Sequence, residues 1–245
     1  MDSGYYAACT ALMSRTQALD TIANNLANAS TVGFRSEHNV FSSVLASASG
    51  ASGTVLNRAM NSFGIMSGTS MDQTQGTLQK TGNDLDVAIQ GSGYLVVQTA
   101  NGPVYTRNGS LQVSGKGQLV TSEGDAVMGD KGEISIVPGK VSISTDGTIS
   151  INGAVAGKLK VVDFPAGTRL TSVGSTYYSV PSDVVPQAST SDVRQGALEG
   201  SNVNPIAGMV DLVTAQRTTE MMQRALSMFN SEIDKTASQD LPKVS

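Results

Sequence analysis

The fold is decided in residues 85–109, which read LDVAIQGSGYLVVQTANGPVYTRNG. Apolar runs at Leu85–Gln90, Tyr94–Gln98 and Val104–Thr106 are separated by Gly-Ser-Gly and Asn-Gly, which are turn sequences. Short runs rich in Val, Ile and Tyr between tight turns predict consecutive antiparallel strands. The stretch therefore predicts an antiparallel β domain of sandwich or barrel type.

The same pattern continues on both sides, over residues 77–199. Asp146-Gly147 and Asn152-Gly153 mark two more turns, because such dipeptides accept positive φ. Further strands are predicted at Gln118–Thr121, Ile134–Val137, Val141–Ser144, Thr148–Ile151, Lys158–Phe164 and Tyr177–Val180.

The two ends of the chain predict helices. Apolar and small residues recur over residues 1–29 at positions a and d of a heptad, with Arg15 interrupting the stripe. Residues 204–237 show a second heptad stripe, in which Thr219 is the weak point, and Asn204-Pro205 is a helix start signal. Heptads this short are marginal in isolation, so we hypothesise that partner chains stabilise them.

The C-terminal helix carries more apolar surface than one partner needs, because a second cluster covers another side of its first turns: Ile206, Met209, Val210 and Val213. The two helices either pack together or cap the β domain separately. Over Phe41–Met71 the only charge is Arg58, so this segment is expected to become ordered against neighbours.

The predicted class is therefore α+β: a discontinuous coiled coil of N- and C-terminal helices plus a central antiparallel β domain. We expect an N-terminal coiled-coil helix at 1–35, an extended linker ordered on assembly at 36–76, the β domain at 77–199, and a C-terminal helix at 200–245 that pairs with 1–35.

Composition excludes several functions. The 245 residues include only 16 scattered Lys and Arg and carry a net charge of −4, so no basic stripe exists for nucleic acid. No apolar run approaches the length of a transmembrane helix, and no cleavable signal peptide is expected. One Cys and one His cannot form an intrachain disulfide or a multi-histidine metal site.

Catalytic candidates are weak. A triad built on His38 lacks a nucleophile-elbow motif, and Cys9 is interpreted as a small packed residue. Asp84 and Asp86 would share one face of a strand, but a strand-edge or turn contact is favoured over acid–base chemistry. We expect no catalytic residue, no cofactor, no metal and no small-molecule substrate.

Four segments in order resemble signatures of the bacterial flagellar rod and hook family. They are Ile22–Arg35, Asn83–Tyr94, Tyr105–Ser110 and Gln195–Asn204, the last continuing to Ala215-Gln216-Arg217. Length and the opening Met1-Asp2 resemble the proximal-rod members most, with distal-rod members next. Gly208 and Thr219 depart from the residues usual in the family.

The resemblance implies that the terminal helices form the inner tube of an axial structure and the β domain its outer layer. Subunits would stack into a rod that crosses the periplasm, after leaving the cell through the flagellar type III export apparatus. Implied partners are copies of this chain and other rod proteins. A secreted β-rich adhesin and a hydrolase using His38 are the alternatives.

On this reading the assembly interface comprises apolar and polar residues of the two helices and the segment after the first: Leu12, Leu19, Ile22, Asn25, Leu26, Asn28, Phe34, Leu212, Ala215, Arg217, Met222, Leu226, Phe229 and Ile233.

Overall fold

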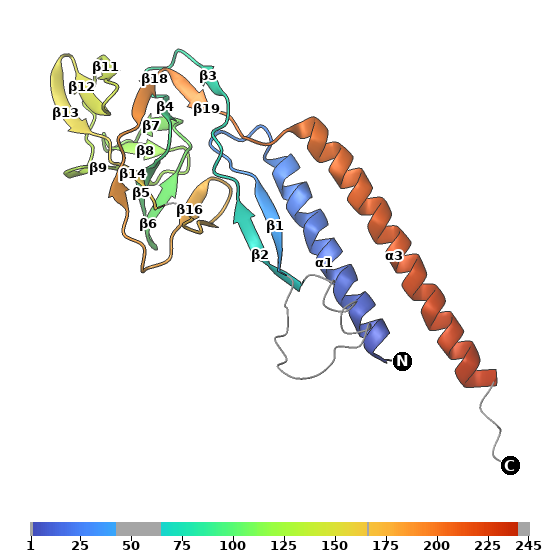
Figure 1. The fold of residues 1–245 in the computed structure, drawn as a ribbon. Helices are drawn as coiled ribbons and strands as arrows, with labels where there is room; N and C mark the ends of the chain where they lie inside the picture. Colours follow the sequence, from blue (N-terminus) through green and yellow to red (C-terminus); the bar gives the residue numbers. More distant parts are fainter. Residues whose placement is uncertain (1, 43–64, 166, 240–245) are drawn as a thin grey trace. The chain divides into compact units, whose positions relative to one another are not determined.

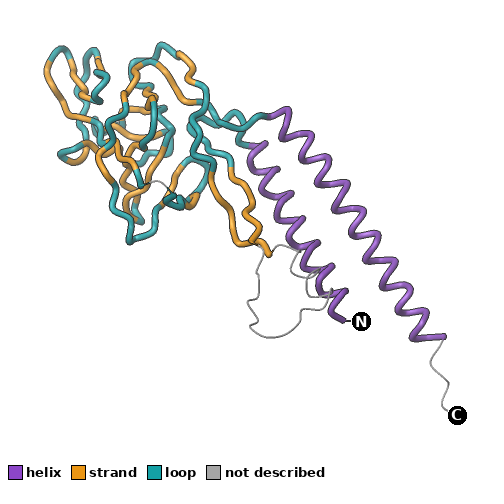
Figure 2. Tube along the Cα trace, viewed as in Figure 1, coloured by secondary structure: helices purple, strands orange, loops and turns teal. Residues whose placement is uncertain are grey.

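The computed structural model describes residues 2–42, 65–165 and 167–239. The chain divides into two compact units. A helical unit contains Met1–Leu26, Glu37–Thr69 and Pro205–Ser245, and a β unit contains Ala27–Ser36 and Ser70–Asn204. The chain therefore crosses between the units after residues 26, 36, 69 and 204 (Figures 1 and 2).

The β unit is built from antiparallel pairs around one large sheet. The ten-stranded sheet has the order β15-β16-β6-β5-β9-β8-β7, with β10 on β9, β14 on β5 and β17 on β14. Its strands are β5 (Tyr94–Thr99), β6 (Gly102–Thr106), β7 (Leu111–Val113), β8 (Leu119–Thr121), β9 (Ala126–Gly129), β10 (Gly132–Glu133), β14 (Val161–Asp163), β15 (Thr171–Ser172), β16 (Tyr177–Ser179) and β17 (Gln187–Ala188).

Three smaller sheets complete the β unit. They pair β18 with β4, β19 with β3, and β11 and β13 with β12. Their strands are β3 (Leu78–Lys80), β4 (Val87–Gln90), β11 (Val141–Ile143), β12 (Thr148–Ile151), β13 (Ala154–Lys158), β18 (Asp192–Gln195) and β19 (Ala197–Glu199).

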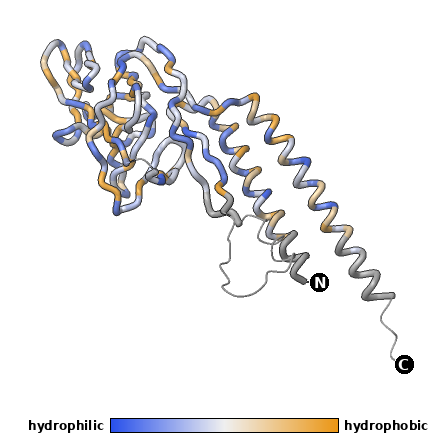
Figure 3. Tube along the Cα trace, in the orientation of Figure 1, coloured by the Kyte–Doolittle hydropathy of each residue, from blue (hydrophilic) through white to orange (hydrophobic). Residues whose placement is uncertain are grey.

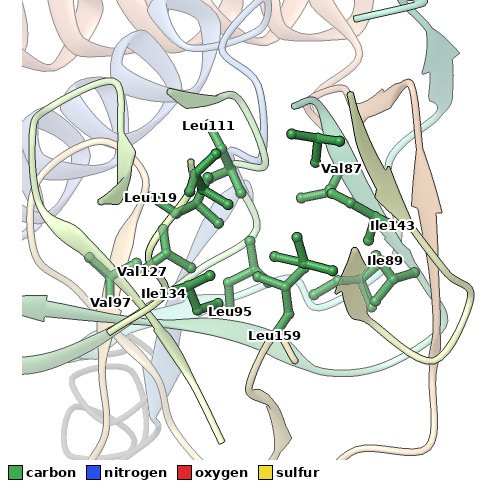
Figure 4. Packing of buried hydrophobic residues seen from close by; sticks show 14 of the residues in the cluster. Val87, Ile89, Leu95, Val97, Leu111, Leu119, Val127, Ile134, Ile143 and Leu159 are labelled. Carbon is green, nitrogen blue, oxygen red and sulfur yellow. The ribbon is translucent and has the colours of Figure 1, made fainter. Parts of the chain in front are cut away.

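The core lies on both faces of β5. Leu95 and Val97 point into one apolar cluster, whereas Tyr94 and Val96 point into a second, as the two-residue period of a strand requires. Figure 4 shows the first cluster, where Leu95 and Val97 lie with residues from β4, β7, β8 and β9. A strand buried on both faces explains why residues 94–97 form a continuous apolar run.

The structure confirms the α+β class with a central antiparallel region and corrects several strands. Ile134–Val137 is not a strand, because only Ser135 forms a bridge, to Gln118. The run Lys158–Phe164 is broken, because β13 pairs with β12 whereas β14 pairs with β5. The mostly polar strands β3 and β18 are not predicted from the sequence, and neither are the short strands β7, β9 and β19.

The helical unit contains α1 (Asp2–Ala27) except its last residue, β1 (Glu37–Ser42), β2 (Ile65–Met71) except its last two residues, and α3 (Pro205–Gln239). Pro205 begins α3, as the start signal predicts. A Cβ atom on Gly208 would lie 3.7 Å from Leu26 Cδ1, so the first turns of α3 meet the last turn of α1. Over the described residues, no helix combines the length and apolarity that a membrane crossing requires.

Strands β1 and β2 form a two-stranded sheet within the segment predicted as a linker. Side chains of α1 attach it, since Thr21 Oγ1 donates to Asn39 Oδ1 at 3.1 Å and Asn25 Nδ2 donates to the Glu37 carbonyl at 2.7 Å. Glu37 N donates back to Asn25 Oδ1 at 2.9 Å. One side of α1 is therefore covered by β1.

Candidate functional site

A buried ionic cluster lies in the β unit where its chain segments continue into the helical unit. The Glu199 carboxylate of β19 lies 2.7 Å from Arg35 Nη2 and 3.0 Å from Arg107 Nη1, and all three side chains are at most 3% exposed. Gly76 N donates to the same carboxylate at 3.0 Å. We call Arg35, Glu199 and Arg107 the Arg–Glu–Arg cluster.

The cluster holds two positive guanidinium groups and one negative carboxylate, and backbone carbonyls accept further hydrogen bonds from both guanidinium groups. Arg107 Nη2 donates to the Gly91 carbonyl at 2.7 Å, and Arg35 Nη1 donates to the Thr74 carbonyl. The Arg107 guanidinium lies 5.0 Å from the centre of the Tyr94 ring, a cation–π distance. Burial lowers the pKa of Arg107, and Glu199 beside it opposes that shift. The cluster is thus held by charge, hydrogen bonds and an aromatic face together.

The segment that follows α1 is fixed in the β unit by its backbone. Gly33 N donates to the Glu199 carbonyl at 2.8 Å, and Arg35 N donates to the Tyr178 hydroxyl at 3.0 Å. Gly33 has a φ of +73°, and a Cβ atom there would lie 2.3 Å from Asn108 N. Only glycine allows this close approach to Asn108. Gly33 and the buried Phe34 therefore fix the backbone so that the Arg35 side chain lies beside Glu199.

Asn202 ties the remaining segments together. Its Oδ1 accepts from Ser36 N at 2.7 Å, and its Nδ2 donates to the Asp72 and Thr74 carbonyls at 3.1 Å each. Asp72 N also donates to the Ser36 carbonyl at 2.8 Å. The three segments that continue into the helical unit are therefore bonded to one another within the β unit.

The helices present two different faces. On α3 the heptad positions are half-buried or buried: Gly208, Leu212, Ala215, Thr219, Met222 and Leu226. Thr219 is 9% exposed, and its hydroxyl donates to the Ala215 carbonyl at 2.9 Å, which satisfies the polar group within the helix. The second apolar cluster, in the first turns of α3, is exposed, with Met209 at 57% and Val210 at 61%. Figure 3 shows these turns in the colour of hydrophobic residues.

The structure separates the residues predicted as one interface. Phe34 is buried in the β unit, Asn25 binds β1, and Asn28 Oδ1 accepts from Thr31 Oγ1 in the turn after α1. Arg217 is exposed. Half-buried positions on the helices are Leu12, Leu19, Ile22, Leu26, Leu212, Ala215, Met222 and Leu226. Phe229 and Ile233 lie in α3, but their side chains are outside the described residues.

The residues considered as catalytic candidates do not form a common site in the described part of the chain. Asp86 is buried and accepts from Thr81 Oγ1 at 2.6 Å and Asn83 Nδ2 at 2.9 Å, whereas Asp84 is exposed in a turn. They do not share a strand face, because the strand β4 begins only at Val87. His38 is exposed on β1, and Cys9 is half-buried on α1.

Sequence reasoning did not single out Arg107, Glu199 and Asn202 as site residues, although the resemblance motifs contain them. For the two charged residues the signal is a charge at the end of a strand: Arg107 directly follows the buried residues 104–106 of β6, and Glu199 is the last residue of β19. Which charges meet depends on strand pairing, which spacing does not reveal.

Three family models match the chain. The flagella basal body rod protein model matches residues 6–35, the flagellar hook protein FlgE/F/G D1 domain matches 88–151, and the flagellar basal body rod FlgEFG protein C-terminal model matches 194–239.

Curated relatives match over nearly the whole length. Flagellar basal-body rod protein FlgF of Caulobacter vibrioides is 32% identical over 100% of both chains. FlgF of Escherichia coli is 35% identical over 93% of this chain and 94% of its own, and FlgG of Bacillus subtilis is 34% identical over 81% and 84%. This chain belongs to the flagellar basal-body rod protein family.

The Arg–Glu–Arg cluster takes one residue from each part that the rod-family models describe. Arg35 is the last residue matched by the N-terminal model, Arg107 lies in the central D1 match, and Glu199 lies in the C-terminal match. The cluster thus joins the three regions that define a basal-body rod protein at one buried point of the β unit.

Proposed function

We propose that this protein is a structural subunit of the flagellar basal-body rod. Copies polymerise helically into the drive shaft that transmits torque across the periplasm for motility. The observation that carries the proposal is the 32–35% identity to basal-body rod proteins over 93–100% of the chain. A repeated contact between unlike surfaces of identical subunits builds such a filament.

The terminal helices form a discontinuous coiled coil in this proposal. The half-buried heptad positions Leu212, Met222 and Leu226, and the approach of Leu26 to Gly208, support it. The β unit then forms the outer layer. The terminal segments 1–35 and 200–245 pair through α1 and α3, whereas β1 and β2 of the segment 36–76 already pair with each other within one chain.

The Arg–Glu–Arg cluster gives the β unit a mechanical role. The chain crosses between the two units at four points, and these covalent connections carry force from one unit to the other. Arg35, Asp72 and Asn202 lie close to three of these crossings, and they are linked by hydrogen bonds: Asn202 donates to the Asp72 carbonyl, and both Asn202 and the buried Arg35 donate to the Thr74 carbonyl. Breaking the Arg–Glu–Arg cluster would strand a buried charge, which costs about 3–5 kcal/mol. The cluster therefore resists being pulled apart under torque.

The rod type is proposed as FlgF-like, at the proximal end, with the distal FlgG-like type as the alternative. Relatives named FlgF match 93–100% of this chain, whereas those named FlgG match 81–89%. Partners are then further copies, other rod proteins and the type III export apparatus.

An in-frame deletion in the native organism tests the function, with electron cryotomography of basal bodies and a swimming assay. We expect non-motile cells whose rods are incomplete, restored by the wild-type gene in trans. The point at which the rod stops distinguishes proximal from distal. Complete rods and normal swimming would contradict the proposal.

A further inference from the structure

Three Asn-Gly dipeptides lie in loops and turns of the β unit, and the structure gives each asparagine a different environment. In such a dipeptide the backbone nitrogen of the glycine can attack the side-chain amide of the asparagine, because glycine has no Cβ atom to obstruct the approach. In a folded chain the attack requires that the side-chain amide and the following backbone can move. The three dipeptides are Asn101-Gly102, Asn108-Gly109 and Asn152-Gly153.

Asn108 is held in a half-buried loop. Its Oδ1 accepts from Ser110 N at 3.1 Å, and its own N donates to Thr106 Oγ1 at 3.0 Å. Gly109 is buried, its carbonyl accepts from Val87 N at 3.0 Å, and a Cβ atom on it would overlap the Val87 carbonyl. The Gly109 nitrogen therefore cannot turn toward the Asn108 side chain without breaking these contacts.

Asn152 is held by the segment before β11. Lys140 N donates to Asn152 Oδ1 at 3.0 Å, and Asn152 N donates to the Lys140 carbonyl at 3.1 Å. Asn152 Nδ2 also packs so closely on Gly139 that a Cβ atom built on that glycine would overlap it. The side-chain amide is therefore kept from rotating toward the nitrogen of Gly153.

Asn101 is free of such restraints. It lies in the loop of the β5–β6 hairpin, where Thr99 pairs with Gly102, and its side chain is exposed. The Asn101 backbone N donates to Thr99 Oγ1 at 3.3 Å, whereas its side-chain amide has no hydrogen bond to any residue that the structure describes. A Cβ atom on Gly102 would meet nothing within 4 Å, so the following residue is not packed either.

We propose that Asn101 is a site of spontaneous modification, at which the folded protein loses ammonia and forms aspartate and isoaspartate. The Gly102 nitrogen attacks Asn101 Cγ, so that a new C–N bond forms and the bond from Cγ to Nδ2 breaks. Nδ2 leaves as ammonia with the proton that the Gly102 nitrogen gives up, and a cyclic succinimide remains. Water then opens the ring at either of its carbonyl groups. The net change consumes one water molecule and replaces an amide by a carboxylate.

The modification alters both the charge and the backbone of the hairpin. Aspartate and isoaspartate each add one negative charge to the loop. Isoaspartate also carries the main chain through its side-chain methylene, so the loop between Thr99 and Gly102 becomes longer. Because loop length fixes the register of a hairpin, the end of β5–β6 loses its pairing in the isoaspartate form. The inference goes beyond the rod function and does not depend on it.

Peptide mapping of the purified full chain by mass spectrometry tests the proposal after incubation at mildly alkaline pH. Trypsin places the three asparagines in separate peptides, 81–107, 108–116 and 141–158. In the folded chain Asn101 should convert roughly tenfold or more faster than Asn108 and Asn152, because only its amide moves freely. In guanidinium chloride all three should convert at similar rates, since unfolding removes the restraints. Methylation by an isoaspartyl methyltransferase identifies the isoaspartate product.

Asn101→Gln is the matched control. It keeps an amide at the exposed position, but its attack would need a larger and less favourable ring, so peptide 81–107 should stay unmodified. Equal conversion of the three asparagines in the folded chain would contradict the protection of Asn108 and Asn152. An unmodified Asn101 in the folded chain, with all three converting after unfolding, would overturn the site. Conversion of peptide 81–107 that persists in Asn101→Gln would place the modification at Asn83 instead.

Discussion

Glu199 is a carboxylate held between two guanidinium groups and a backbone amide, with 1% of its side chain exposed. Arg35 and Arg107 each meet backbone carbonyls as well, but their Nε atoms have no hydrogen-bond acceptor among the described residues. The carboxylate is therefore the group on which the burial of two positive charges depends.

Neutralising this carboxylate should destabilise the β unit. Glu199→Gln should lower the free energy of unfolding by about 3–5 kcal/mol, because two buried cations lose their counter-ion. Urea unfolding of the purified chain measures the change. Glu123→Gln, at an exposed site, is the matched control and should shift it by less than about 0.5 kcal/mol. Equal midpoints for the two variants would contradict the role of the cluster.

Gly33 offers a test of the backbone path. Gly33→Ala adds a Cβ atom 2.3 Å from Asn108 N, whereas Gly82→Ala, at a similar φ of +78°, meets nothing within 4 Å. Both variants pay about 1–2 kcal/mol for the left-handed conformation. The Gly33 variant should lose clearly more stability in the same urea titration, and an equal loss would show that the segment can move away from Asn108.

At the scale of the element, α3 separates an inner stripe from an outer face. Thr219 lies in the stripe without cost, because its hydroxyl bonds to the preceding turn. The Met and Val side chains of the first turns lie outside the stripe and remain exposed. A helix with two apolar faces is suited to more than one neighbour.

A charge in the stripe should block assembly. Leu226→Asp, and likewise Leu26→Asp, should abolish rod incorporation and swimming while leaving β-unit stability unchanged, because an unpaired charge is costly in a packed seam. Ala225→Asp, exposed on the adjacent position of α3, is the matched control and should swim. Motility in both stripe variants would contradict the coiled-coil proposal.

At the scale of the whole molecule, the boundary between the units does not follow the ends of the helices. Residues 27–36 belong to the β unit although they directly follow α1, because Gly33, Arg35 and Ser36 bond to its strands and loops. The piece that stays folded when the helices have no partner should therefore include this segment.

Hydrogen exchange on the dilute monomer should reveal this division. The amides of Gly33 and Arg35 should exchange slowly, together with those of β5 and β6, since they bond within the β unit. Amides of α1 and α3 should exchange quickly before assembly, because isolated heptads are marginal. Slow exchange throughout both helices would contradict that expectation, and fast exchange at Gly33 and Arg35 would contradict the fixed segment.

Short sequence patterns predict both helices and the strands that are bounded by clear turn sequences. Short runs bounded by Gly-Ser-Gly, Asn-Gly or Asp-Gly turns specify β5, β6 and β12, and Asn204-Pro205 specifies the start of α3, since these features depend on residues a few positions apart. The four ordered motifs likewise indicated the family from short stretches of sequence. The strand β18 is not predicted, because its conformation comes from pairing with the buried β4 and not from its own mostly polar residues.

The site followed a different logic. Arg35, Arg107 and Glu199 are separated by 72 and 92 residues along the chain, and nothing in their local sequence states that they meet. Strand pairing brings them together, and the exclusion of water turns three ordinary charges into one interdependent cluster. Turns and helix ends depend on residues close together in the sequence, so short stretches determine them. The environment of a buried charge depends on every segment that packs around that charge, so only the tertiary structure determines it.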